Sequence, residues 1–266
     1  MIFAVPRCWT FTASFGALHV VLCVTALTRR IFALCPSLIA AFGIALTVAC
    51  SSGGSPALVV DLEPLSAAEV ISRSSDALSG ITTFRFALSH DHGNTILSNG
   101  IEVPKASGTA MVPDSYTLDA DTLVAGFFVN TQVTVIDQDS YITHPITQRW
   151  QLLEPGTSPF GTFNPVSLVA SILEQIENPK IAPTEASEAG SYVVDGFLPA
   201  IALKSLTGGV DETAPLLEVR VTIDGSSFYP VEARITGRAT SAEYGDLVRT
   251  VRLFEFNSDI AIEPPI

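Results

Sequence analysis

The segment LLEVRVTIDGSSFYPVEARIT, residues 216–236, decides the fold class. Its first half carries apolar side chains at positions 217, 219, 221 and 223 and polar ones between them. Strict alternation predicts a half-buried strand, and Asp224-Gly225-Ser226-Ser227 is typical of the turn before a return strand at 229–236. We therefore expect an antiparallel hairpin with one apolar face, which needs cover from other elements.

The same period of two recurs along the chain. It predicts strands at 81–89, 95–103, 107–113, 115–121, 123–136, 141–143, 191–196 and 248–256. Helices are expected over 61–80, where Ser66-Ala67-Ala68-Glu69 is a capping box, after Asn164-Pro165, and over 199–206. Residues 178–190, rich in Pro, Glu, Ala and Ser, predict a surface connection. The expected class is α+β, a mostly antiparallel sheet covered by a few helices. Alternation alone leaves open whether the helices fill the apolar face or leave a cavity.

The N-terminal region has the pattern of a bacterial lipoprotein signal. Arg29 and Arg30 precede the apolar residues 31–49, and small side chains lead to Cys50. Small residues suit a signal peptidase, and the thiol of Cys50 can take a diacylglyceryl group, whose two chains give stable anchoring. Residues 50–60 then form a flexible linker. The alternative is a cysteine that ends a transmembrane helix.

A second apolar stretch, residues 11–28, lies upstream and is not needed by a signal peptide. A translation start set too early, near residue 1 instead of Arg29, explains it best. An extra membrane segment is the alternative, at the lower edge of spanning length. Residues 1–49 are therefore treated as a targeting segment and 61–266 as the folded domain.

Composition excludes several classes of function. Three of the four cysteines precede Cys50, so the domain has neither a disulfide framework nor a cysteine nucleophile. Of the 14 basic residues, three precede Cys50, which leaves 11 against 27 acidic residues and a net charge of −16. Nucleic acid is a poor partner for such a surface.

Few side-chain groups suggest catalysis or metal binding. His90-Asp91-His92, with His144, could hold a metal, but a polar hairpin tip is the favoured interpretation. Asp137-Gln138-Asp139 lacks the rest of a calcium loop, and Asp119 with Asp121 fits a surface strand. We expect no enzyme, no metal and no cofactor, and a hydrolase is the weakest of the hypotheses.

Several ordered features together resemble a known family. A capped helix and a strand with Phe84-Arg85-Phe86 follow Cys50. Further features are the segments 133–150, Val194–Ala200, 221–231 and Leu253–Asn257 with its extension to Pro265. In this order they resemble the LppX/LprG-type lipoproteins, which share a fold with the outer-membrane lipoprotein carrier LolA. The departures are Thr47 where the signal pattern has Leu, and a Thr-rich strand at 216–223.

The resemblance implies a strongly curved antiparallel half-barrel wrapped around helices, with an apolar cavity that holds acyl chains of lipids or glycolipids. It implies a lipid-anchored, extracytoplasmic protein that carries lipid between membrane and outer envelope, with a membrane transporter as a further candidate partner. A surface-tethered sensor or interaction module that binds a protein is the alternative. The inward-facing candidates for the cavity, each of which could also be ordinary core, are Phe84, Phe86, Leu88, Phe127, Val129, Val133, Val135, Val169, Ile172, Leu173, Leu217, Val219 and Val221.

Overall fold

The structure, a computed structural model, describes residues 62–161, 163–183 and 190–266. The expected targeting segment 1–49 and the linker 50–60, with Cys50, lie outside these residues.

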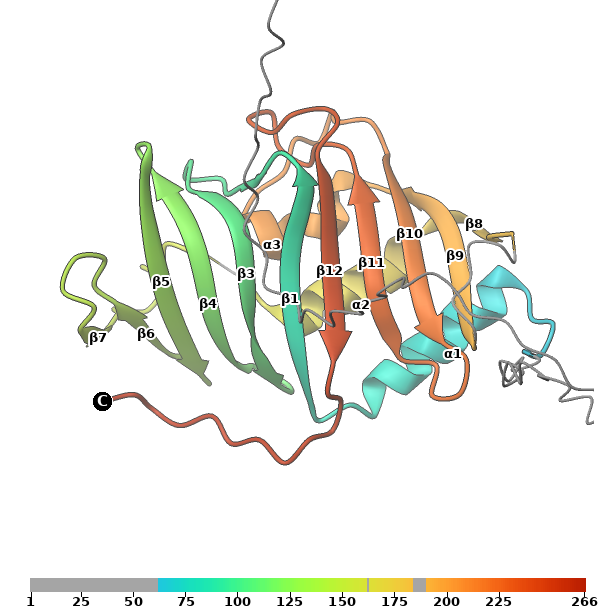
Figure 1. The fold of residues 1–266 in the computed structure, drawn as a ribbon, viewed down its shortest axis with the longest axis horizontal. Coiled ribbons are helices and arrows are strands. Elements are labelled where there is room, and N and C mark those ends of the chain that lie inside the picture. The colour runs from blue at the N-terminus through green and yellow to red at the C-terminus, as the bar shows by residue number, and fades with distance from the viewer. Residues whose placement is uncertain (1–61, 162, 184–189) are drawn as a thin grey trace, which may run out of the picture. The chain divides into compact units, whose positions relative to one another are not determined.

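An antiparallel sheet of twelve strands dominates the domain (Figure 1). Its order is β7-β6-β5-β4-β3-β1-β12-β11-β10-β9-β8, with β2 paired to β3. The sheet is curved and does not close, as the expected half-barrel requires. The strands are β1 (Thr83–His92), β2 (Thr95–Ile96), β3 (Glu102–Met111), β4 (Ser115–Val124), β5 (Phe127–Ile136), β6 (Asp139–Thr143), β7 (Trp150–Leu152), β8 (Glu177–Ile181), β9 (Ser191–Leu198), β10 (Leu217–Asp224), β11 (Pro230–Thr236) and β12 (Val248–Phe254).

Helices cover one face of this sheet (Figure 1). They are α1 (Ala67–Ser79), α2 (Pro165–Gln175), the 3-10 turn η2 (Ala200–Leu203) and α3 (Lys204–Thr207). The predicted caps are present: the Ser66 side chain accepts from the Glu69 amide, and Asn164 accepts from the Ser167 amide at 2.9 Å. The α+β class with an antiparallel half-barrel over helices is therefore confirmed.

Two strand predictions at the hairpins were wrong. The segment 123–136 is not one strand, because β4 ends at Val124 and β5 begins at Phe127. Ala125 and Gly126 both have positive φ, 50° and 82°, the geometry of a tight hairpin turn. Likewise 95–103 is divided between β2 and the start of β3, which continues to Met111.

The connection expected over 178–190 is only partly a connection. Residues Glu177–Ile181 form β8, an edge strand paired to β9, while 184–189 lie outside the described residues. The polar composition that suggested a loop is also typical of an edge strand, where charged side chains limit further pairing.

A stripe of small residues on β3 makes room for large rings on β1. Ala106, Gly108 and Ala110 share one face of the strand, and Gly108 is paired with Phe86. A Cβ atom on Gly108 would lie 1.9 Å from the Thr117 carbonyl oxygen and 2.7 Å from the Phe86 ring. The close approach of β3, β4 and the Phe86 ring therefore requires glycine at this position.

We expect Gly108→Ala to destabilise the domain by about 1–3 kcal/mol, because backbone must shift to admit the methyl group. Urea unfolding followed by circular dichroism measures the change. Gly245→Ala is the matched control, since a Cβ there meets nothing within 4 Å, and it should unfold like the wild type. Equal stability of the two variants would contradict the proposed steric role of Gly108.

Candidate functional site

An apolar void of about 30 Å³ lies between the sheet and the helices. Among the described residues that line it, only Thr95 is polar. Its walls come from the inner faces of β1, β3, β4 and β12, from the loop before α2, and from α2 and α3. They are Phe86, Leu88, Thr95, Leu97, Val103, Ala106, Leu118, Phe160, Phe163, Pro165, Leu168, Val169, Leu206, Val251 and Leu253.

A second void of about 10 Å³ continues the first along α2. Both are lined by Val169, Val251 and Leu253, so they are neighbours between α2 and β12. We call this line of loose apolar packing the α2–β12 seam. Apolar voids of this size hold no water. The apolar side chains on the two sides of the seam can therefore exchange their contacts with each other for contacts with another hydrocarbon.

The predicted cavity residues other than Phe127 divide into four groups. Phe86, Leu88 and Val169 line the first void, and Ile172, Leu173 and Val221 line the second together with Val169. Partly buried positions are Val129 and Val135. Fully buried positions that line neither void are Phe84, Val133, Leu217 and Val219.

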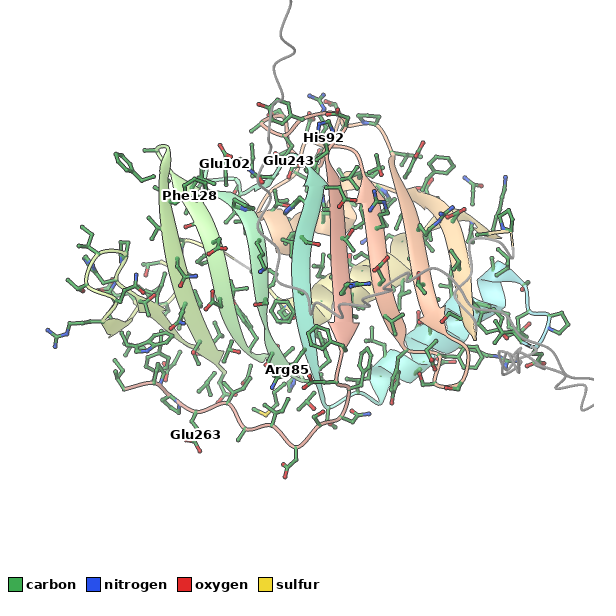
Figure 2. The ribbon with its side chains drawn as sticks, in the orientation of Figure 1. Arg85, His92, Glu102, Phe128, Glu243 and Glu263 are labelled. Atoms are coloured by element: carbon green, nitrogen blue, oxygen red, sulfur yellow. The ribbon has the colours of Figure 1, made fainter. Side chains whose placement is uncertain are left out.

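Phe127 does not lie in the interior, and its side chain is 74% exposed. Its side chain lies on the predicted face of β5. Further along the strand, Thr131 and Val133 on this face are buried. However, Phe127 stands at the turn between β4 and β5, beyond the cover of the helices (Figure 1). With Val124 and with Phe128, which is 78% exposed (Figure 2), it forms an exposed apolar hairpin tip.

Several lining residues were missed by the sequence interpretation. Val251 and Leu253 alternate within the predicted strand 248–256, so the period of two could have identified them. Phe160 and Phe163 come from an irregular loop with no periodic signal. The Phe163 ring packs 5.9 Å from Phe86 and 5.3 Å, edge-on, from Tyr116, so this loop supplies one wall of the void.

A polar layer closes one end of the first void. On the inner faces of β1 and β12 the cross-strand pairs run Phe86–Leu253, Leu88–Val251 and then His90–Arg249. The first two pairs line the void, and the third continues the same faces by one step. Charged and hydrogen-bonding groups therefore follow directly on apolar walls.

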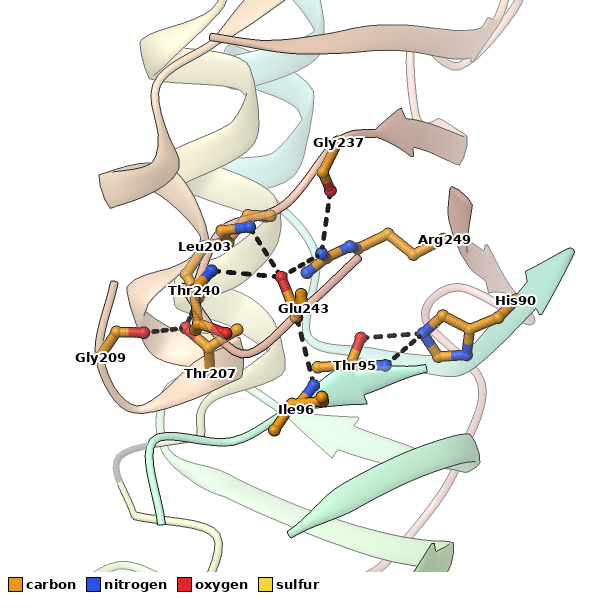
Figure 3. A network of polar contacts seen from close by, with 11 residues as sticks. His90, Thr95, Ile96, Leu203, Thr207, Gly209, Gly237, Thr240, Glu243 and Arg249 are labelled. Carbon is orange, nitrogen blue, oxygen red and sulfur yellow. Dashed lines mark hydrogen bonds and ion pairs between the residues drawn. The ribbon is translucent and has the colours of Figure 1, made fainter. Parts of the chain in front are cut away.

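This layer is held by short hydrogen bonds (Figure 3). His90 Nδ1 donates to the Pro104 carbonyl at 2.7 Å, and Nε2 accepts from the Thr95 hydroxyl at 2.8 Å and the Thr95 amide at 3.2 Å. The ion pair of Arg249 and Glu243, 2.8 Å long, is completely buried. Burial lowers the pKa of His90, so the ring is neutral at neutral pH, as its acceptor role toward Thr95 requires.

Comparisons with solved structures identify the fold. LprF from Mycobacterium bovis matches with TM-score 0.55 and 14% identity, over 75% of this chain and 96% of LprF. The lipoprotein LppX from Mycobacterium tuberculosis matches with TM-score 0.50 and 17% identity, over 74% of this chain and 98% of LppX. The domain has the LppX-type fold. No protein-family model and no curated protein matches the chain.

Within this LppX-type fold the histidines considered for a metal site are separated. A bulge between His90 and His92 breaks the strand register, so His90 points inward while His92 is exposed and pairs with Asp246 at 3.1 Å. His144 accepts from the amides of its own turn. In the part of the chain that the structure describes, no three His, Cys, Asp or Glu side chains are placed to hold a metal.

The outer face of the LppX-type sheet is polar. Asp119 and Asp121 lie there and both accept from Asn130, at 2.8 and 3.2 Å. Open grooves of about 420 and 400 Å³ on this face are lined largely by charged and polar side chains and backbone, including the ion pair of Arg220 with Asp195. They are larger than the inner voids but offer no dry apolar walls. None of the described helices has the length and hydropathy needed to cross a membrane.

The half-buried His90 predicts a pH-dependent stability. Its folded-state pKa is lowered, mainly by burial, so the unfolded chain takes up the proton first. Between pH 7 and 5.5 the free energy of unfolding should therefore fall as pH falls, by at most about 1.4 kcal/mol per pH unit for one proton. Urea unfolding across this range measures it. His90→Gln should flatten the profile and the exposed control His92→Gln should not. A profile unchanged in His90→Gln would exclude His90 as the source.

Proposed function

We propose that this protein is a lipid-anchored, extracytoplasmic lipoprotein that binds acyl chains between its sheet and its helices. It is not an enzyme, and it carries lipids or glycolipids between the membrane and the outer envelope. The observation that carries this proposal is the α2–β12 seam, an interior with almost wholly apolar walls. The LppX-type fold, shared with a lipoprotein, supports it.

The seam must widen before it can hold a chain. Voids of about 30 and 10 Å³ admit only one or two water-sized groups. Each buried methylene contributes about 0.8 kcal/mol, so ten methylenes contribute about 8 kcal/mol toward separating α2 from β12. When α2 separates from β12, the apolar side chains of the seam lose their contacts with each other. They pack against the hydrocarbon chain instead, so the separation leaves no polar group of the seam unpaired.

A bulky side chain in the seam tests acyl binding. Val169 lines both voids, so Val169→Trp should fill them and reduce co-purified lipid severalfold. Quantitative mass spectrometry of lipid extracted from protein isolated from its own host measures this. Ser167→Trp is the control, because Ser167 lies on the exposed face of the same helix, and it should keep the wild-type load.

Overpacking at position 169 costs about 1–3 kcal/mol, so thermal unfolding must show that the variant is folded. A folded Val169→Trp protein with an unchanged lipid load would exclude the seam as the binding place. Wild-type protein isolated without any lipid would remove the proposed function itself.

Anchoring at Cys50 has a separate test. The mature protein should begin at Cys50 and carry a diacylglyceryl group there, which mass spectrometry of the N-terminal peptide detects. Cys50→Ala should retain residues 31–49, since lipidation of the thiol precedes cleavage. Cys35→Ala, within the signal, should be processed normally. An unmodified Cys50 in the cellular protein would contradict the lipoprotein proposal.

A protein-binding module is the second candidate function, and two observations favour it. The interior is close to filled, and the hairpin tip of Val124, Phe127 and Phe128 is exposed. A saturable protein ligand that is lost in the Phe127→Ser, Phe128→Ser double variant, on a domain without lipid, would establish this alternative over the lipid carrier.

A further inference from the structure

A groove of about 400 Å³ crosses the outer face of the sheet, on the side away from the helices (Figure 1). The strand register places five of its lining residues in one row across β12, β1, β3, β4 and β5: Phe254, Arg85, Thr109, Thr117 and Thr134. Neighbouring strands lie about 4.8 Å apart, so this row is about 19 Å long. Its length suits a short chain of linked units better than one small molecule. We call this surface the outer groove.

Aromatic side chains stand at both ends of the outer groove. Phe254, at the end of β12, is 41% exposed although the sheet face around it is polar. Trp150, at the start of β7 and therefore beyond β5 in the sheet order, is half-buried and lines the other end. An exposed aromatic ring on a polar surface offers a flat apolar platform to a ligand.

The floor between the two rings carries hydrogen-bonding groups that are already oriented. The Gln132 side-chain amide donates to Asp119 at 3.2 Å, and Asp119 also accepts from Asn130 at 2.8 Å. The Thr117 hydroxyl accepts from the Thr109 amide at 3.3 Å and keeps its own proton to donate. Groups that are held in place before binding lose little entropy when a ligand arrives. The floor thus presents both donors and acceptors.

The charge of the outer groove selects an uncharged ligand. Among the described residues that line it, Arg85 (Figure 2) and Asp119 are the charged ones, and their charges cancel. The other groove on this face, of about 420 Å³, is lined by five charged side chains: Lys180, Asp195, Glu218, Arg220 and Arg234. A charged ligand in the outer groove would lose hydration without gaining a net counter-charge.

The position of the outer groove in the sheet disfavours a peptide strand or an acyl chain. All five strands beneath it are paired on both sides, so their backbone groups cannot pair with an added strand. Hydrocarbon would cover the polar floor without replacing its bonds to water. A neutral sugar chain meets both requirements of the groove. Its hydroxyls donate and accept, and its C–H faces pack on aromatic rings, whose faces are negative.

We propose that the outer groove binds a neutral polysaccharide of the cell envelope. Hexose rings stack on Trp150 and Phe254, and their hydroxyls bond to Thr109, Thr117 and Gln132 between the two rings. The sheet separates this groove from the α2–β12 seam, so the sugar is not the headgroup of a lipid held in the seam. The envelope as its source follows from the proposed extracytoplasmic location, whereas the binding itself does not depend on acyl binding.

Trp150 supplies the signal for the test, because it is the one tryptophan that follows Cys50. Mature acylated protein, kept in a detergent without a sugar headgroup, is titrated with the neutral tetrasaccharides cellotetraose and maltotetraose and with the anionic tetragalacturonate. We expect a neutral tetrasaccharide to change the tryptophan fluorescence saturably at millimolar concentration. Tetragalacturonate should bind at least about threefold more weakly, because the protein is acidic.

Two variants, each with a matched control, locate the binding. Phe254→Ala should weaken it about two- to tenfold, the loss expected for one aromatic contact, while Phe128→Ala, at the exposed hairpin tip, should bind as the wild type. Thr109→Val should weaken it severalfold, while Thr250→Val, on the outer face of β12 but outside the groove, should not. Thermal unfolding of each variant confirms that it is folded.

The outcomes separate this proposal from acyl binding. No fluorescence change with either neutral tetrasaccharide would overturn it, as would wild-type affinity in both folded groove variants. Tighter binding of tetragalacturonate would overturn the neutral class, and saturable binding of octaproline in place of the sugars would assign the groove to a peptide. Lipid-stripped and lipid-loaded protein should bind the tetrasaccharide equally. Sugar binding by a protein that never carries lipid would remove the proposed function and leave the polysaccharide site standing.

Discussion

Apolar packing across the sheet–helix interface is the interaction on which the rest of this structure depends. Residues 62–266 contain no cysteine, so no disulfide can hold the helices against the sheet. The helices and the sheet are instead held together by side chains whose sizes are complementary. Ala106, Gly108 and Ala110 on β3 make room for the Phe86 ring, against which Phe163 packs from the loop before α2. The match is close at β3 and loose between α2 and β12, which is where the voids lie.

The inner face of the sheet changes from apolar to polar along β1 and β12. Three consecutive cross-strand pairs of β1 and β12 change from apolar to polar at His90 and Arg249. Burying an ion pair is seldom favourable in itself, because desolvation offsets much of the attraction. Here the Glu243 carboxylate also accepts three amides, so it organises the loop between β11 and β12 over this end of the sheet. The ion pair therefore closes the interior at one end, and the α2–β12 seam is the loosely packed part of the interior.

The sequence predicts those features that depend on local pattern. Alternation places β10 and β11, and the side chains of Ser66 and Asn164 cap the helices as expected. It fails where the signal is not local. The turn at Ala125 has no polar residue to mark it, and Phe127 has the correct face but lies outside the helical cover. The face of Arg249 also follows from alternation, yet its complete burial depends on Glu243, which lies in a loop. No periodic pattern predicts that contact.

How the interior can open follows from what each layer is made of. Neighbouring strands are hydrogen-bonded to one another across the sheet, so the sheet resists local separation. The helix α2 packs on α1, η2 and α3, and the side chains that reach from it to β12 across the seam are apolar. Apolar contacts are non-directional and can be exchanged for contacts with another hydrocarbon, whereas a broken strand pair would leave amides and carbonyls unpaired. A ligand chain that enters this fold must therefore lift helices from the sheet, with the polar layer of His90, Arg249 and Glu243 as the fixed end against which the seam widens.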